Sequence, residues 1–356
     1  MINRRNFLRY TGIGLPLFLA DSHQLTAQIS NDRTDLTILK PAKLCKGDQI
    51  GLIAPAWQIN EKDLQLSVEK IKALGLVPIY SSQILGKYGY FSGTDKERAR
   101  EFDYMIETPS IKAIIAVSGG YGCTRILDLL DYNAIKVFPK IIMGFSDNTA
   151  LLNAIHEKTG LITFHGPISR TIHHDYSKKQ FEHIVMNPVD QYIIESAQED
   201  LQKSAEDSVF ERYTITSGKA SGKLAGGNLT LICSMIGTPY EIDLKDKIVM
   251  IEDIGEEPYR IDRMLTQLLS GGNLQKAAGI AFGICKGCDK SAKSKAPDSF
   301  TLRQVIEDRI KPLNIPAVYG LSFGHNQHNF TFPIGLHAEL DTNRMTIKLQ
   351  EKAVES

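Results

Sequence analysis

The stretch KIIMGFSDNTALLNAIHEKTG (140–160) changes character in its middle and indicates the fold of the first half of the chain. Its first five residues (140–144) form an apolar run that is typical of a buried strand. From position 149 the apolar residues recur at helical spacing, and the run ends on Gly160, a residue type that commonly terminates helices. The stretch therefore predicts a strand, a tight turn and a helix.

The turn itself, FSDN (145–148), allows two interpretations. Ser, Asp and Asn accept hydrogen bonds from the unpaired N–H groups of a first helical turn, so Ser146, Asp147 or Asn148 would serve as a helix cap. Alternatively, Ser146 is a nucleophile on a strand-to-helix turn similar to the G-x-S-x-G elbow, with Asn148 where the second glycine would stand. These residues alone leave both interpretations open.

The same alternation continues on both sides of this stretch. Short apolar runs alternate with amphipathic segments, and this rhythm predicts a doubly wound α/β domain with a parallel sheet. We place this N-terminal domain, which carries the nucleophile, at residues 41–170. The predicted strands are 49–56, 112–117, 140–144 and 161–167, and the predicted helices are 61–75, 124–131 and 149–160.

The rhythm stops at residues 171–215, which are polar and weakly periodic and therefore indicate a connecting segment. A second and smaller β-rich domain is predicted over 216–350. It combines the strand KIVMIEDIG (247–255), the helix PYRIDRMLTQLLSGG (258–272) and a β-rich tail that starts at PAVYG (316–320).

Composition sets limits on the class of protein. The 356 residues suit about two domains, and 42% hydrophobic and 23% charged residues are ordinary for a globular chain. The formal net charge is zero and the two signs are interspersed, so no nucleic-acid partner is predicted.

The first 27 residues have the pattern of an export signal. Arg4 and Arg5 precede a short apolar segment (13–20), and small residues follow near 25–27. The arginine pair resembles the twin-arginine class, which predicts a periplasmic protein. The apolar segment is shorter than the roughly 20 residues of a spanning helix, so stable membrane insertion is not expected. Cleavage and tethering of the signal both remain open.

No cofactor or metal is predicted. The glycine-rich SGGYG (118–122) lacks the G-x-G-x-x-G spacing and the lysine of a phosphate loop. Among five cysteines, Cys285 and Cys288 form a lone C-x-x-C, which is at most half a zinc site; a local disulfide stays open.

Three reactive residues follow strand-like runs, namely Ser146, Glu252 and His325. In open α/β sheets, such residues gather at the carboxyl ends of strands. A serine needs a base to remove its proton, and a carboxylate orients the histidine that does so. The loop 118–122 would supply N–H donors for an oxyanion. Taken singly, Glu252 also fits a solvated acidic turn, and His325 fits a loop histidine or, with His328, a metal ligand.

The order of these motifs resembles the LD-carboxypeptidase family, serine peptidases that include the microcin-immunity peptidases. The similar segments run in the family's order through most of 46–335: KGDQIGLIAPA (46–56), GYFSGTDKERAREF (89–102), GGYGCTRILDLLDYNAI (119–135), PKIIMGFSDNTALLNAIHEKTGLITFHGP (139–167), GKLAGGNLTLICSMIGTPY (222–240), IVMIEDIGEEPYRIDRML (248–265) and GLSFGHNQHNFTFPIG (320–335).

This resemblance implies a role for each candidate residue. Ser146 matches the nucleophile, His325 the general base and Glu252 the carboxylate that orients it. The backbone N–H groups of Asp147 and Gly120 match the oxyanion hole. The family's N-terminal domain would supply the serine and its β-rich C-terminal domain the other two, in a homodimer without a metal.

The implied reaction is hydrolysis of the bond before the terminal D-alanine of a murein tetrapeptide, at the L-centre of its diamino acid. Many such family members carry Arg directly before GGYG, where this chain has Ser118. That difference leaves two alternatives: a microcin-immunity-like peptidase that cleaves a peptidyl-nucleotide or acyl-amino-acid compound, and a non-catalytic periplasmic binder of wall peptides.

Overall fold

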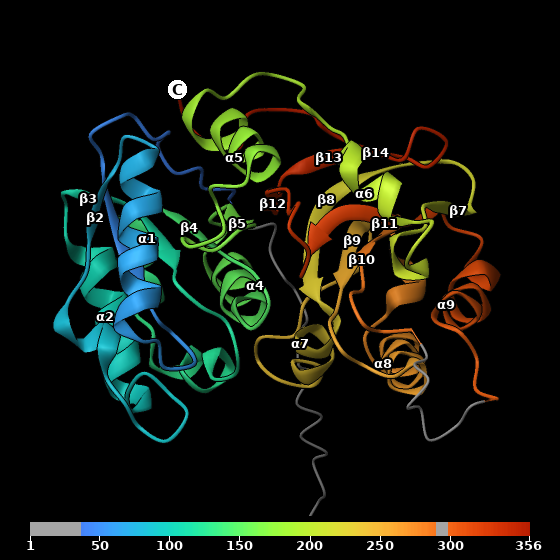
Figure 1. Cartoon of the computed structure of the whole chain (residues 1–356), viewed down its shortest axis with the longest axis horizontal. Helices are drawn as coiled ribbons and strands as arrows, with labels where there is room; N and C mark the ends of the chain where they lie inside the picture. The colour runs from blue at the N-terminus through green and yellow to red at the C-terminus, as the bar shows by residue number, and fades with distance from the viewer. Residues whose placement is uncertain (1–36, 290–297) are drawn as a thin grey trace, which may run out of the picture. The chain divides into compact units, whose positions relative to one another are not determined.

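The computed structural model describes residues 37–289 and 298–356, and they belong to one compact unit with two β-sheets (Figure 1). The predicted export signal, residues 1–27, lies outside the described residues. Within the described ranges, no helix combines the length and apolarity that crossing a membrane requires.

The first sheet has the strand order β12-β5-β4-β3-β1-β2, in which β1 to β5 are mutually parallel. The chain builds outward from β1 in one direction to β2 and in the other through β3, which makes the β1–β3 boundary the switch point of a doubly wound sheet. Its strands are β1 Gln49–Ile53, β2 Val77–Ile79, β3 Ile111–Ala116, β4 Ile141–Gly144, β5 Thr163–His165 and the antiparallel β12 Phe332–Ile334.

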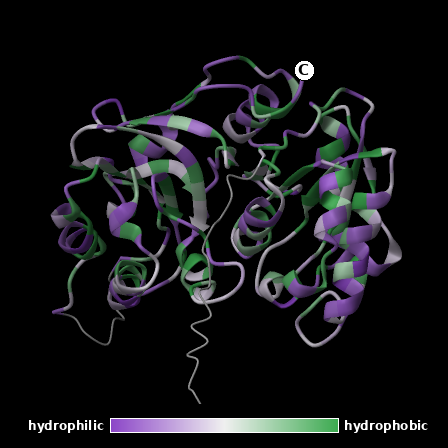
Figure 2. Cartoon of the chain, turned by 180° about the vertical axis from the view of Figure 1, so that it is seen from behind, coloured by the Kyte–Doolittle hydropathy of each residue, from purple (hydrophilic) through white to green (hydrophobic). Residues whose placement is uncertain are grey.

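The helices between these strands have clear sequence causes. Capping boxes open α1 (Glu61–Ala73) at Asn60 and α2 (Asp95–Glu107) at Thr94, and Gly160 in the left-handed conformation ends α4 (Asn148–Thr159). Both hydrophilic and hydrophobic residues occur along the helices of the molecule, as expected where one face of a helix covers a sheet (Figure 2).

The helix predicted over 124–131 is wrong. The chain forms only two 3₁₀ turns there, Cys123–Arg125 and Leu127–Leu129. Asp131 accepts hydrogen bonds from the N–H groups of Asn133 and Ala134 and so opens α3 (Tyr132–Val137), which begins directly after the predicted helix would end.

The second sheet has the order β6-β14-β13-β8-β9-β10-β11-β7. Its centre, β8 to β11, is parallel, and antiparallel strands flank it on both sides. The strands are β6 Ile193–Ile194, β7 Tyr213–Thr216, β8 Lys219–Asn228, β9 Lys247–Glu252, β10 Gly279–Ile284, β11 Ala317–Gly324, β13 His337–Asp341 and β14 Thr346–Leu349.

The helices around this sheet are α7 Leu229–Ser234, α8 Pro258–Ser270 and α9 Leu302–Ile310. The segment 171–215 holds α5 (Asp175–Phe181), a π-helical turn at Glu182–Met186, α6 (Gln198–Lys203) and a 3₁₀ turn at Ser208–Phe210. It also supplies β6 and β7, the two edge strands of the second sheet. The segment 171–215, which the sequence predicts only to connect the two domains, therefore also supplies strands to the second sheet.

Buried hydrogen bonds join α4 to the end of β8. The Asn153 side chain accepts from the N–H of Gly226 at 3.1 Å and donates to its carbonyl at 2.9 Å. The Thr149 hydroxyl accepts from the N–H of Asn228 at 3.0 Å. Gly227 lets the strand come this close, because a Cβ there would lie 2.5 Å from the Thr149 Oγ1. The helix that starts beside Ser146 is thus attached to the second sheet.

Candidate active site

Ser146 stands on the turn between β4 and α4, and its backbone φ is +61°. A left-handed conformation is uncommon for a residue other than glycine, and it turns the side chain out of the path from strand to helix. Gly144 makes room for the turn, since a Cβ there would lie 2.8 Å from the Asn148 side chain. The turn therefore has the geometry of a nucleophile elbow.

Glu252 and His325 reach Ser146 from the second sheet. Glu252 is the last residue of β9, and His325 follows the last residue of β11. The Nε2 of His325 lies 2.9 Å from the Oγ of Ser146, and its Nδ1 lies 2.7 Å from the Oε2 of Glu252. Gly324 has a φ of +105°, and a Cβ there would lie 2.7 Å from the same Oε2. The three predicted side chains thus form one hydrogen-bonded series.

Burial and charge act in opposite directions on this pair. Burial would raise the pKa of Glu252, but the charge of His325 and its hydrogen bond outweigh it, so the pKa lies below its usual value. Burial would lower the pKa of His325, but the charge and hydrogen bond of Glu252 raise it above the usual value. The carboxylate therefore stabilises the protonated imidazole that proton transfer from a serine would create.

The interpretation of Ser146, Asp147 or Asn148 as a side-chain cap of α4 is wrong. Asp147 occupies the N-cap position but makes no capping hydrogen bond, because its Oδ2 accepts from the N–H of Cys123 at 2.8 Å. The Asn148 amide donates to the carbonyls of Ser118 and Phe145. Both side chains attach the loop after β3 to the elbow instead of closing the helix.

That loop brings Gly119 next to Ser146. An added Cβ on Gly119 would lie 3.1 Å from the Ser146 Cβ and 3.6 Å from the Asp147 nitrogen. Gly120 has a φ of +104°, which favours glycine. Within the described ranges, neither the Asp147 nor the Gly120 N–H donates to a protein acceptor outside regular secondary structure. The Asp147 N–H thus adjoins the serine, the Gly120 N–H belongs to the residue after the glycine that contacts the serine, and neither has such an acceptor.

Several residues near the site were not predicted. Arg98 is buried and donates hydrogen bonds to the carbonyls of Pro55 and Gly122, so it stabilises the glycine loop. The sequence gives no signal of this role, because a charged residue in an amphipathic helix is usually exposed. Trp57, Tyr90 and Tyr121 form an exposed aromatic rim, in which Trp57 covers Gly120 and the two tyrosine rings lie 6.2 Å apart. Trp57 follows β1, Tyr121 follows β3 and Tyr90 precedes α2, and these positions are the only signal that sequence offers.

A second buried histidine lies beside the series. His165 closes β5, is fully buried, and stacks on Phe332 with ring centroids 4.6 Å apart. Burial lowers its pKa to about 4, so the imidazole is neutral at ordinary pH. The Phe145 ring is in T-shaped geometry with both histidines, with its centroid 6.3 Å from that of His165 and 5.0 Å from that of His325, so the His325 ring has an apolar neighbour.

His328 does not join this series. Its Nδ1 lies 2.7 Å from the Oδ1 of the buried Asp200, so it connects the loop after β11 to α6. No group of His, Cys, Asp or Glu in the described ranges is arranged to hold a metal ion.

Cys285 and Cys288, the two cysteines of the C-x-x-C pattern, are both buried and are both free thiols. Burial raises the pKa of each thiol.

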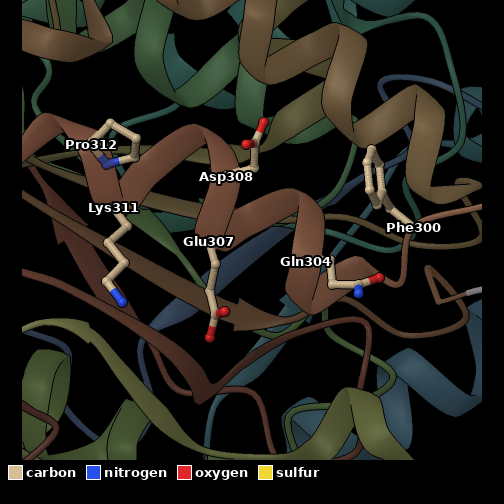
Figure 3. Close-up of a pocket in the computed structure, with 6 residues that line it drawn as sticks. All are labelled: Phe300, Gln304, Glu307, Asp308, Lys311 and Pro312. Carbon is tan, nitrogen blue, oxygen red and sulfur yellow. The ribbon is translucent and has the colours of Figure 1, made fainter.

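A separate surface pocket lies along α9 (Figure 3). None of the five predicted site residues borders it. Its lining residues are Phe300, Gln304, Glu307, Asp308, Lys311 and Pro312.

Comparison with known proteins agrees with this geometry. Residues 50–166 match the N-terminal domain and residues 221–340 the C-terminal domain of LD-carboxypeptidases. A probable murein peptide carboxypeptidase of Bacillus subtilis is 37% identical over 316 residues, which cover 87% of this chain and 94% of the relative. The chain belongs to the LD-carboxypeptidase family. As a member it is a carboxypeptidase of the serine type.

Solved structures of this family show the same fold. The microcin self-immunity protein MccF in complex with glutamyl sulfamoyl guanosine has a TM-score of 0.79 at 26% identity, over 89% of this chain and all of that one. A muramoyltetrapeptide carboxypeptidase from Oxalobacter formigenes has a TM-score of 0.72 at 26% identity, over 86% of this chain and all of that one. The predicted α/β fold with a second, β-rich part is confirmed.

Proposed function

We propose that this LD-carboxypeptidase removes the terminal D-alanine of a murein tetrapeptide, with Ser146 as nucleophile, His325 as general base and Glu252 as the group that orients the histidine. The observation that carries the proposal is the hydrogen-bonded series from the Ser146 Oγ through the His325 ring to Glu252. The name of the Bacillus subtilis relative supports a murein peptide as the substrate class.

In the first half-reaction, the Ser146 Oγ attacks the carbonyl carbon of the L-centred residue while its proton moves to the His325 Nε2. Negative charge develops on the carbonyl oxygen, where the N–H groups of Asp147 and Gly120 would stabilise it. The tetrahedral species then collapses: the C–N bond breaks, His325 delivers the proton to the leaving amine, and D-alanine departs. The acyl group stays on Ser146 as an ester.

In the second half-reaction, water takes the place of the leaving amine. His325 accepts a proton from this water, the oxygen attacks the ester carbon, and the tripeptide leaves with a new carboxyl group as Ser146 regains its proton. Glu252 stays ionised throughout, since its pKa lies below the usual value, and stabilises the imidazolium each time it forms.

Two further parts of the proposal concern the protein's setting. The export-signal pattern of residues 1–27 supports a periplasmic location, where murein peptides occur, and the family resemblance favours a homodimer. Fractionation of cells that express the full chain tests the first part. Sedimentation of the purified protein tests the second: a monomer at micromolar concentration contradicts it.

A second candidate keeps the same three residues and changes the substrate to a peptidyl-nucleotide or acyl-amino-acid compound. Two observations favour it: the likeness to MccF in complex with glutamyl sulfamoyl guanosine, and the uncharged Ser118 directly before the glycine loop. The exposed rim of Trp57, Tyr90 and Tyr121 would also suit a flat base.

One experiment separates the candidates. Purified protein and its Ser146→Ala variant are incubated with murein tetrapeptide and, separately, with glutamyl sulfamoyl guanosine, and the products are identified by mass spectrometry. Release of D-alanine by the wild type alone supports the first proposal. Cleavage of the second compound without D-alanine release supports the second candidate. If the variant hydrolyses either substrate as fast as the wild type, the assignment of Ser146 as nucleophile is wrong. If neither protein cleaves either substrate, the result favours the third alternative, a non-catalytic binder of wall peptides.

A further inference from the structure

A carboxypeptidase must recognise the free carboxylate at the end of its substrate, and this site holds few cations that are available for it. Ser118 has no charge. The two arginines near the glycine loop are already engaged: Arg98 and Arg125 both contact the Asp95 carboxylate, and Arg125 does so through two nitrogens. Neither guanidinium is therefore free to meet a substrate beside Ser146.

Lys286 lies between the two strands that deliver Glu252 and His325. It follows β10 by two residues, and the last residue of β10, Ile284, stands in register with Gly324, directly before His325. On its other side, the backbone of Lys286 forms a parallel bridge with Ile254, two residues after Glu252, and its carbonyl accepts from the N–H of Gly255 at 2.9 Å. Its backbone is thus held at the carboxyl edge of the strands that carry the site.

The side chain of Lys286 is exposed. Within the described ranges it has no ion pair with an acidic side chain. Its positive charge nevertheless acts on His325, since it is among the groups that lower the pKa of that imidazole. The charge of Lys286 therefore lies within electrostatic range of the base, and its backbone stands on the sheet edge that carries His325.

We propose that the Lys286 ammonium group binds the terminal carboxylate of the substrate and so makes this site prefer peptides with a free C-terminus. This inference rests on the proposed function of Ser146 and His325. It adds a specificity-determining residue in a position that the glycine loop and its neighbouring arginines do not fill.

The chemistry of the leaving group supports this placement. His325 must reach the leaving nitrogen, and in a C-terminal residue the carboxylate is attached to the carbon next to that nitrogen. A cation that serves the carboxylate must therefore lie on the histidine side of Ser146 rather than on the oxyanion side. The buried acids Glu252 and Asp253 occupy the same edge and would repel an anionic substrate, which a lysine there offsets. The flexible stem of lysine lets its charge follow the carboxylate.

The test compares two substrates that differ only at the C-terminus: a murein tetrapeptide that ends in D-alanine and the same peptide that ends in D-alanine amide. We expect the wild type to prefer the acid. In Lys286→Ala, kcat/KM for the acid should fall about 10- to 100-fold, mainly through KM, because a charge-assisted contact is lost. The value for the amide should stay within about twofold. Lys286→Arg should keep most of the preference.

Lys276 provides a matched control. It is exposed in the 3₁₀ turn Leu274–Lys276 that precedes β10, at the opposite end of that strand, so Lys276→Ala should behave as the wild type. The inference is overturned if Lys286→Ala retains the preference for the acid, or loses the same factor on acid and amide. If the wild type releases D-alanine and Ser146→Ala does not, either of these results for Lys286→Ala overturns only the role of Lys286 and leaves the proposed function in place. If the wild type cuts neither peptide, the proposed function fails and the inference fails with it.

Discussion

The Nε2 of His325 lies 2.9 Å from the Oγ of Ser146, although 179 positions separate the two residues along the chain. Ser146 follows β4 of the first sheet, whereas His325 follows β11 of the second. Their contact therefore depends on how α4 is attached to β8, which sets the two sheet edges against each other. Activity and stability should respond together to changes in that attachment.

The backbone of Ser146 should be measurably strained. A left-handed φ of +61° costs a residue with a Cβ about 1 kcal/mol, and glycine escapes this cost. Ser146→Gly should therefore unfold in urea with a free energy about 1 kcal/mol higher than Ser146→Ala. Both variants should lose about 10⁴-fold or more of kcat/KM because the nucleophile is gone. Equal stability of the two variants would show that the turn carries no strain.

The pH dependence of hydrolysis should report on Glu252. The base form of His325 is needed, so kcat/KM rises as pH increases through the pKa of this residue, which Glu252 holds above its usual value. Glu252→Gln removes the negative charge and leaves the burial, so the acid limb should move to lower pH. The plateau should fall about 10³- to 10⁴-fold. Glu256→Gln, which changes a nearby acid outside the series, should leave the acid limb of the pH profile unchanged. A shift of the same size in this variant would argue against a specific interaction between Glu252 and His325.

Gly120 should tolerate no side chain. A Cβ at this position would lie 2.3 Å from a ring carbon of Trp57 and would meet a φ of +104°. Gly120→Ala should displace the loop and misalign its N–H group, which lowers kcat about 10²- to 10³-fold with a smaller change in KM. Gly89→Ala is the control, because Gly89 also has a positive φ but has open space around it. If both variants lose the same activity, backbone strain rather than the oxyanion loop explains the loss.

The sequence predicts those parts of this molecule that depend on local pattern. The strand–turn–helix around Ser146 follows from apolar spacing and from Gly160, and family motifs predict that Ser146, Glu252 and His325 act together. Local pattern misses what long-range contacts decide. Residues 124–131 have helical spacing but form two 3₁₀ turns, and the α-helix starts only after Asp131, which caps it.

Other features have no local signal at all. The sequence suggests that Asp147 caps α4, but its carboxylate instead accepts a hydrogen bond from the N–H of Cys123, 24 positions away. The strand β12, near the end of the chain, pairs with β5 of the first sheet rather than with its sequence neighbours. The +61° φ of Ser146 arises from the packing of its turn, and nothing in the residue type favours it.

Asn153 should couple stability to activity. Its buried amide satisfies both the N–H and the carbonyl of Gly226, so Asn153→Ala leaves two buried backbone groups without partners. The free energy of unfolding should fall by about 2 to 4 kcal/mol. Because α4 begins beside Ser146, kcat/KM should fall as well, even under conditions where the variant is fully folded by circular dichroism. Asn133→Ala, an exposed position in α3, is the control; full activity in folded Asn153→Ala would contradict the coupling.

Glu101 should make the protein less stable as pH rises. It is buried in α2 and accepts a hydrogen bond from the Ser81 hydroxyl at 2.6 Å; burial raises its pKa to about 7. Between about pH 4.5 and 7 the folded state therefore holds more protons than the unfolded state, and its stability falls with increasing pH. Glu101→Gln keeps an acceptor for Ser81 without the charge. Above pH 7 it should unfold in urea with a free energy up to about 3 kcal/mol above that of the wild type, and the difference should shrink toward pH 5. Glu107→Gln, at an exposed position at the end of the same helix, is the control and should show no such trend. If the free energy of unfolding of Glu101→Gln differs from that of the wild type by a constant amount from pH 5 to 8, a titrating carboxyl is not the cause.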